Sequence, residues 1–214
     1  MPLYEPEREE FQELRDSATG RRCFIIGTGK SLLDVDLSLI EGECTFGVNG
    51  LVSYKGLPFP PMFYCMMDPI AFERWQDKVE QVPTLRIAGI RDGQTLDEWI
   101  TVEQRQDRAI EEGWFPGLES QFTWCSGCTN VVWGLVVPLA YWLGFQTVYL
   151  LGVDGGRFGH CYDDVEVDYS VANRMVTPEI IAKTREVFEK DGRKIINLNP
   201  ETEGLPTATL QEVV

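Results

Sequence analysis

The chain has 214 residues, a hydrophobic content of 43% and a formal net charge of −15 at pH 7. This length and composition predict one globular domain over residues 1–214, large enough to bury a core. The acidic excess, without any run of lysine or arginine, argues against nucleic acid or an anionic membrane as a partner.

Neither a signal peptide nor a membrane span is predicted. Residues 1–15 are acidic and polar, and the apolar stretch 131–143 is well short of the ~20 residues that cross a bilayer. Free thiols act as small hydrophobic side chains inside apolar runs. The six cysteines are at positions 23, 44, 65, 125, 128 and 161, and most of them lie inside apolar runs. We therefore expect a cytoplasmic protein without disulfides.

The first half of the chain alternates short apolar runs with polar or helical segments. A short amphipathic helix is expected within residues 5–15, with Phe11 and Leu14 facing inward. The polar stretch 89–121 is expected to hold a helix at residues 96–112 and to form an excursion from the sheet. Strands are expected at residues 23–26, 44–48, 62–67 and 84–87, and a helix at residues 70–79.

In the second half, a strongly apolar helix is expected at residues 129–143, with Gly144 as its C-terminal cap. Thr177 and Pro178 are the residue types of an N-cap and a first helical position, and they predict a helix at residues 178–190. The other expected elements are a central strand at residues 147–151, a polar loop at 155–176 and a last strand at 194–198.

Apolar strands that alternate with helices, without a period of two in polarity, indicate a parallel sheet covered on both faces. The predicted fold class is therefore α/β, with a Rossmann-like, mainly parallel sheet. Such sheets bind ligands beyond the carboxyl ends of their strands, and polar residues or glycines follow several of these ends. The predicted site residues are Gly27, Thr28, Gly29, Asn49, Asp68 and Asp154, with His160 in the loop just beyond.

The segment Gly27-Thr28-Gly29-Lys30-Ser31 lies between a predicted strand and a predicted helical turn. Backbone N–H groups at such a junction can bind a phosphate, and glycine lets the phosphate approach the backbone. A simple corner in an α/β domain would use the same glycines. A Walker A loop is not favoured, because the position five residues before Gly29 is Phe24 instead of glycine.

His160 is the only histidine of the chain and lies in a polar loop. Histidine is the natural proton acceptor at neutral pH, so His160 is either a catalytic base or a surface side chain without a role. Asp154 would bind a metal or a ribose, or cap a turn, and Asp68 would serve in a turn. The C-x-x-C pair of Cys125 and Cys128 lacks the two further ligands of a structural zinc site.

Four short segments occur in the order Phe-Ile-Ile-Gly-Thr-Gly-Lys-Ser-Leu, Gly-Val-Asn49, Met-Met-Asp68-Pro and Leu-Gly-Phe-Gln-Thr-Val-Tyr-Leu-Leu-Gly-Val-Asp154. In this order they resemble two related groups of proteins with a Rossmann-like fold. One is the bacterial and phage group similar to the 6-hydroxymethylpterin diphosphokinase MptE. The other is the bacterial sialyltransferases that use CMP-sialic acid. The resemblance covers about residues 22–198.

The sialyltransferases hold their nucleotide with a Gly-Asn-Gly-Pro-Ser loop, an asparagine after the second strand and a turn before a late helix. Thr28 stands where this family has asparagine, and Lys30 where it has proline. A histidine in a similar Gly-His context is the general base of these enzymes, which implies that role for His160. The nucleotide-binding residues that the resemblance and the strand ends together imply are Gly27, Thr28, Gly29, Lys30, Ser31, Asn49, Asp68, Thr129 and Asp154.

The resemblance implies a transferase with a nucleotide-activated donor, foremost a sialyltransferase-like, inverting glycosyltransferase. Its donor would be a CMP-sugar or another nucleotide-sugar, and it would need neither a metal nor another cofactor. The alternative is an MptE-like diphosphokinase that binds ATP and magnesium through Asp68 and Asp154. A further alternative is a nucleotide-binding module without catalysis.

Overall fold

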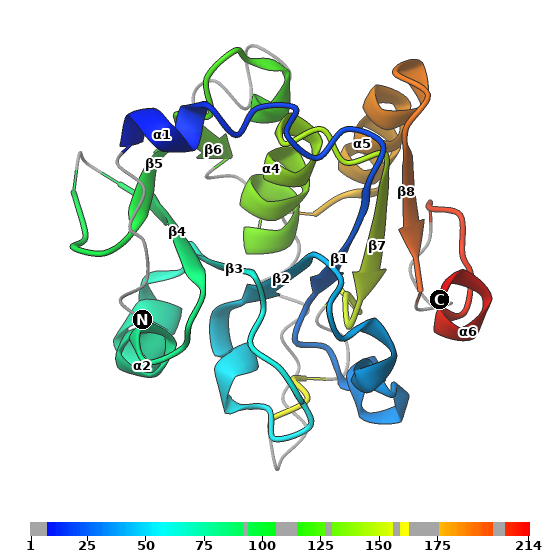
Figure 1. Cartoon of the computed structure of the whole chain (residues 1–214), viewed down its shortest axis with the longest axis horizontal. Coiled ribbons are helices and arrows are strands. Elements are labelled where there is room, and N and C mark those ends of the chain that lie inside the picture. The colour runs from blue at the N-terminus through cyan, green and yellow to red at the C-terminus, as the bar shows by residue number, and fades with distance from the viewer. Residues whose placement is uncertain are drawn as a thin grey trace.

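The computed structural model describes residues 8–91, 94–105, 115–126, 130–155, 159–162, 176–198 and 204–214. Its centre is an eight-stranded sheet in the order β6-β5-β4-β3-β2-β1-β7-β8 (Figure 1), and every neighbouring pair is parallel. The predicted α/β, Rossmann-like fold is confirmed. The strands are β1 (Arg22–Ile26), β2 (Thr45–Val48), β3 (Phe63–Met66), β4 (Leu85–Ile90), β5 (Ile100–Arg105), β6 (Trp124–Ser126), β7 (Thr147–Leu151) and β8 (Lys194–Asn197).

The direction in which strands are added reverses next to β1. Strands β1 to β6 follow one another toward one edge, whereas β7 returns to the other side of β1 and β8 follows it. At the ends of this central pair, Ile26 lies beside Leu151. A reversal of this kind opens a crevice beyond the carboxyl ends of the strands. The loops that leave β1 and β7 therefore border the expected ligand position.

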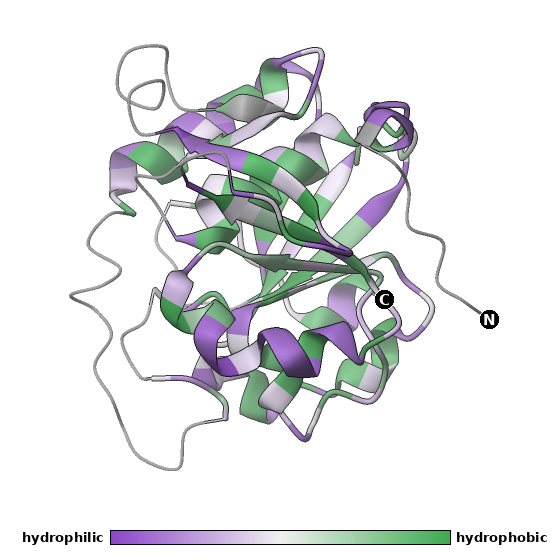
Figure 2. Ribbon diagram, turned by 90° about the vertical axis from the view of Figure 1, so that its left-hand side faces the viewer, coloured by the Kyte–Doolittle hydropathy of each residue, from purple (hydrophilic) through white to green (hydrophobic). Residues whose placement is uncertain are grey.

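Helical segments cover both faces of the sheet, which lies between them in the side view of Figure 2. The strands are buried on both sides: Phe24 and Ile25 are both fully buried, but in two different hydrophobic clusters. The cluster around Ile25 contains residues of α1 (Arg8–Gln12), α4 (Val137–Trp142) and α5 (Pro178–Lys190). The cluster around Phe24 contains residues of α2 (Pro69–Glu80), α6 (Leu210–Val213) and the 3-10 turns η1 (Lys30–Asp34), η2 (Leu37–Ile40) and η3 (Asn49–Ser53).

The expected helix at residues 96–112 is wrong where the structure describes this stretch. Residues 100–105 form β5, which pairs with β4, and β4 itself continues to Ile90. Ile100 and Val102 are buried while Thr101 and Glu103 are not, so this strand alternates in polarity and has no long apolar run. β6 was not predicted either, although it extends the sheet beyond β5. Part of the expected excursion is therefore sheet, and residues 106–114 lie outside the described residues.

Most other predicted elements are confirmed to within a few residues. Helix α5 has the predicted bounds, and the Thr177 side chain accepts a hydrogen bond from the N–H of Ile180. Phe11 is fully buried on α1, as expected. β7 is confirmed, but only β8 separates it from the edge of the sheet, so it is less central than expected. Of the expected loop 155–176, only residues 155, 159–162 and 176 are described.

The apolar helix expected at residues 129–143 is described from Asn130 onward and begins at Val131. Its first part is a π-helical turn, Val132–Val136, which continues into α4. The N–H of Val137 donates to the carbonyl of Val132, five residues back. Pro138 has no N–H and cannot continue an ordinary α-helical ladder, and the wider turn before it accommodates the proline. Gly144 follows the helix with φ of +94°, as a C-terminal glycine does.

The cysteines that the structure describes, at positions 23, 44, 65, 125 and 161, are buried free thiols. Cys128 lies outside the described residues. Among the helices of the described ranges, none combines the length and the apolar character that crossing a membrane requires.

Candidate functional site

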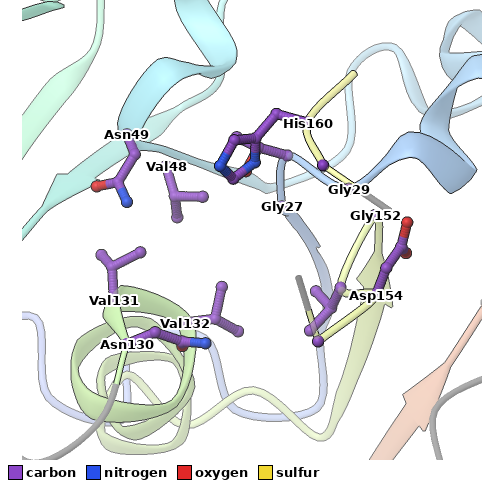
Figure 3. Close-up of a pocket in the computed structure, with 14 residues that line it drawn as sticks. Gly27, Gly29, Val48, Asn49, Asn130, Val131, Val132, Gly152, Asp154 and His160 are labelled. Carbon is purple, nitrogen blue, oxygen red and sulfur yellow. The ribbon is translucent and has the colours of Figure 1, made fainter. Parts of the chain in front are cut away.

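A small pocket lies at the carboxyl ends of the central strands, where the topology predicts a crevice (Figure 3). Its volume of about 90 Å³ is small beside the ~300–1,000 Å³ of typical ligand pockets. A bound nucleotide would therefore place one group inside the pocket and extend beyond it. The lining residues come from the ends of β1, β2 and β7, from the start of the apolar helix and from the segment around His160. They are Gly27, Thr28, Gly29, Val48, Asn49, Asn130, Val131, Val132, Gly152, Val153, Asp154, Gly155, Gly159 and His160.

The glycines after β1 serve close packing against the end of β7. A Cβ on Gly27 would lie within 3.0 Å of the carbonyl oxygen of Gly152, and one on Gly29 within 3.0 Å of the Asp154 carboxylate. The N–H groups of Gly27 and Gly29 donate to the carbonyls of Leu151 and Gly152, both at 2.7 Å. These two N–H groups, expected to bind phosphate, are thus already engaged within the protein.

Asp154 anchors the same loop. Its carboxylate accepts hydrogen bonds from the backbone N–H of Ser31, at 2.8 Å, and from the Ser31 hydroxyl. The side chain is buried, and in Figure 3 it points away from the space between Asn49 and His160. Asp154 therefore lines the pocket but directs its carboxylate into the loop that follows β1.

The helix that points at the pocket is a different one from that expected. η1, which follows Gly29, is a 3-10 helix of five residues. By contrast, the first turn of the apolar helix, at Val131 and Val132, lines the pocket and lies below it in Figure 3. The Asn130 side chain accepts a hydrogen bond from the N–H of Trp133 at 3.2 Å, as an N-capping side chain does. The positive end of this helix dipole is the part of the pocket best suited to an anion.

Asn49 lines the opposite side of the pocket, immediately after β2. Its φ of +44° is left-handed, a conformation that asparagine tolerates better than most residues. The Tyr64 hydroxyl donates to its carbonyl at 2.7 Å, and burial raises the pKa of Tyr64 well above its usual range, so this donor keeps its proton. The Asn49 side-chain oxygen is buried and has no hydrogen-bond partner in the described part of the chain. A buried acceptor without a partner is costly, and a ligand hydroxyl or amino group would remove that cost.

His160 reaches the pocket because its segment pairs with the loop after β1. Gly29 and His160 form an antiparallel bridge, and the N–H of Cys161 donates to the carbonyl of Thr28 at 2.8 Å. The Thr28 hydroxyl lies 2.8 Å from Nδ1 of His160. The imidazole also stacks on the ring of Tyr162, with 5.0 Å between ring centroids and an interplanar angle of 17°. The Thr28 hydroxyl and the Tyr162 ring thus help to hold the only histidine of the chain at the pocket.

The other predicted residues are placed differently. Asp68 is exposed, caps α2 by accepting a hydrogen bond from the N–H of Ile70 at 2.9 Å, and does not line the pocket. Lys30 and Ser31 also lie outside the lining. Thr129, with the neighbouring residues 127 and 128, is outside the described residues.

The pocket residues missed by the sequence analysis are Asn130 to Val132, the glycines at positions 152, 155 and 159, and the valines at positions 48 and 153. An asparagine before an apolar run is an N-cap signal and could have identified the first group. Among the described lining residues, Asp154 is the acidic side chain, and lysine and arginine do not occur. The pocket thus offers amides, a hydroxyl, an imidazole and a helix N-terminus, with little fixed positive charge.

Comparison with known proteins shows a structural relationship. Neither a protein-family model nor a curated protein matches this chain. Two solved structures match over most of both chains, each with a TM-score of 0.54 and 14% sequence identity. One is the sialyltransferase CstII from Campylobacter jejuni in complex with cytidine-5'-monophosphate, covering 89% of this chain and 86% of that chain. The other is the sialyltransferase CST-II with a trisaccharide acceptor and CMP, covering 88% and 86%.

At this identity the likeness shows a shared fold. The chain has the α/β, Rossmann-like fold of a sialyltransferase, and the expected structural relation to that class is confirmed. The relation to MptE-like diphosphokinases stays a prediction.

Proposed function

We propose that this protein is a transferase with a nucleotide-activated donor, of the sialyltransferase-like, inverting type. The observation that carries the proposal is the position of His160, whose ring lies at a pocket beyond the carboxyl ends of parallel strands and contacts Thr28. The shared fold supports it, because both of the matching structures described above are of a sialyltransferase in complex with CMP.

In this proposal the phosphate of the donor binds at the first turn of the helix that begins at Val131. The helix dipole and the backbone N–H groups there supply the positive potential that the described side chains of the pocket do not. The Asn49 side-chain oxygen receives a hydrogen bond from a hydroxyl or amino group of the nucleotide. The glycine loop after β1 supplies shape, since its packing against Asp154 fixes one wall.

The reaction is a direct displacement. His160 takes the proton of an acceptor hydroxyl as the hydroxyl oxygen forms a bond to the anomeric carbon of the donor sugar. The bond between that carbon and the phosphate oxygen breaks on the opposite face, and the nucleotide leaves with the electron pair. One displacement inverts the anomeric configuration, and the proton balance closes when His160 releases its proton to solvent.

The diphosphokinase alternative has no specific support in the described residues. It needs Asp68 and Asp154 at one metal ion, whereas Asp68 caps α2 outside the pocket lining and the Asp154 carboxylate binds Ser31. The diphosphokinase and the nucleotide-binding module without turnover are therefore kept as the alternatives to the transferase.

The test is a thermal-shift panel with CMP, UDP, GDP and ATP, each with and without magnesium. A ligand at a hundred times its Kd stabilises the protein by ~2.7 kcal/mol, which for a chain of this size shifts Tm by about 5–10 °C. We expect the largest shift with CMP, independent of magnesium. Magnesium-dependent stabilisation by ATP would favour the diphosphokinase. The same stabilisation by all four nucleotides would argue against a donor-specific transferase.

A further inference from the structure

Thr28 and His160 both line the pocket, and the Thr28 hydroxyl oxygen lies 2.8 Å from Nδ1 of His160. A neutral imidazole carries its proton on one nitrogen and its lone pair on the other, and the partner of one nitrogen decides which is which. If Nδ1 keeps the proton and donates it to Thr28, the lone pair lies on Nε2. If the hydroxyl donates to Nδ1, the lone pair is used there. This single contact therefore bears on whether Nε2 can accept a proton.

Backbone contacts around Thr28 hold the Thr28 hydroxyl and the His160 ring next to each other. The Thr28 carbonyl accepts the N–H of Cys161, the residue after His160, and Gly29 bridges to His160 itself. In the described part of the chain, Nδ1 of His160 is the one hydrogen-bond partner of the Thr28 hydroxyl. When the hydroxyl accepts from Nδ1, its own proton remains available to the pocket that Thr28 also lines.

The plane of the imidazole is fixed from a second side. Tyr162 stacks on it, and the edge of the Tyr162 ring meets Trp75 at a centroid distance of 5.3 Å and an angle of 64°. Gly50 makes room for this arrangement, because a Cβ there would lie within 3.0 Å of the Tyr162 ring and hydroxyl. Stacking on Tyr162 restricts the rotation of the imidazole, and in the resulting orientation Nδ1 lies within hydrogen-bond distance of the Thr28 hydroxyl.

We propose that Thr28 is the positioning residue of His160: its hydroxyl accepts the Nδ1–H hydrogen bond and so places the lone pair on Nε2. The contact between the hydroxyl and Nδ1 is observed, and the direction of its hydrogen bond is the one that a base role of Nε2 requires, so this inference rests on the proposed function. Thr28 stands where the resembling sialyltransferase loop has asparagine.

The test uses the fact that the chain has one histidine. Tag-free protein labelled with ¹⁵N-histidine gives only the two ring nitrogens of His160 in a long-range ¹H–¹⁵N spectrum. The spectrum is recorded without ligand, at a pH where the ring is neutral. We expect Nδ1 at the position of a protonated nitrogen and Nε2 far downfield, at that of a nitrogen with a lone pair. Thr28→Val, which has nearly the same shape, should exchange these two positions or bring them toward each other, and Thr28→Ser should restore the wild-type pattern.

Two controls separate this role from a general effect on the loop. Ser31→Ala removes a hydroxyl from the same loop that binds Asp154 instead of His160, and should leave the tautomer unchanged. Thr28→Ala removes the hydroxyl by a second route, should Thr28→Val fold poorly. A wild-type protein with its proton on Nε2, or the same tautomer in wild type, Thr28→Val and Thr28→Ala, would overturn the proposal.

Adding CMP to the same samples tests the proposed function separately. The absence of any CMP-induced change in the spectrum would count against the transferase. The spectra without ligand would still decide the role of Thr28.

Discussion

Substitution of Gly29 tests directly whether packing against Asp154 stabilises the pocket. A glycine is required at this position because a side chain would not fit, and its backbone conformation is open to other residues. Its φ of −68° and ψ of 155° are ordinary extended backbone that alanine adopts readily. A Cβ, however, would lie closer than 3.0 Å to three atoms of the Asp154 carboxyl group. Gly29→Ala must therefore displace the carboxylate, and with it the hydrogen bonds to the N–H and the hydroxyl of Ser31.

The expected cost follows from those two bonds. A hydrogen bond to a charged group contributes roughly 1.5–3 kcal/mol, and the displaced carboxylate recovers part of this from water. Gly29→Ala should therefore lower the free energy of unfolding by about 3 kcal/mol. For a chain of about 200 residues this corresponds to a fall in Tm of roughly 6–12 °C. Urea unfolding followed by circular dichroism measures the change.

The comparison that tests the reasoning is the same substitution in an Asp154→Ala background, where the clashing atoms are gone. There Gly29→Ala should be neutral or should stabilise by about 0.4–1 kcal/mol, because alanine restricts the unfolded chain more than glycine does. The coupling between the two sites is then about 3–4 kcal/mol. Equal costs in both backgrounds would refute the packing argument.

Three further predictions concern the site and the core. Given a productive donor, His160→Asn should lower kcat by ~10²–10⁴-fold and leave CMP affinity nearly unchanged; full activity would refute the base assignment. Asp68→Ala should cost about 1 kcal/mol of stability through the lost cap of α2, without changing CMP affinity measured by calorimetry. A large loss of affinity would place Asp68 in the site. Burial raises the pKa of the Cys44 thiol to about 12 and the pKa of the Cys23, Cys65 and Cys125 thiols well above their usual range. Titration with a thiol reagent at pH 8 should therefore leave these four cysteines unreacted until urea unfolds the protein.

The sequence was sufficient for the parts of the fold that depend on local pattern. Strands such as β1 and β7 are continuous apolar runs, and the Thr177-Pro178 pair marks the start of α5. β5 was missed because its buried Ile100 and Val102 alternate with polar residues in a stretch rich in charge. In such a stretch the period of two competes with the helical propensity of neighbouring glutamate, glutamine and arginine.

The location of the site followed from topology, whereas the roles of its residues did not. The carboxyl ends of parallel strands meet at one edge, so Thr28, Asn49 and His160 could be expected together. The bond between Ser31 and Asp154 joins residues 123 positions apart, and no local pattern predicts that Asp154 anchors a loop. For the same reason the sequence could not show that the amides of Gly27 and Gly29 are already engaged.

These contacts divide the pocket into a scaffold and a set of ligand-facing groups. The amides of Gly27 and Gly29 donate to the carbonyls of Leu151 and Gly152, and Ser31 donates to the Asp154 carboxylate. These bonds fix the ends of β1 and β7. Among the described residues, the groups that we expect to face a ligand are the Asn49 amide oxygen, the first turn of the helix at Val131 and the pair of Thr28 with His160. A net charge of −15 makes the approach of an anionic nucleotide unfavourable at long range. Short-range recognition by a helix terminus and by uncharged donors and acceptors suits such a chain, because these groups bind an anion without a lysine or arginine among the described lining residues.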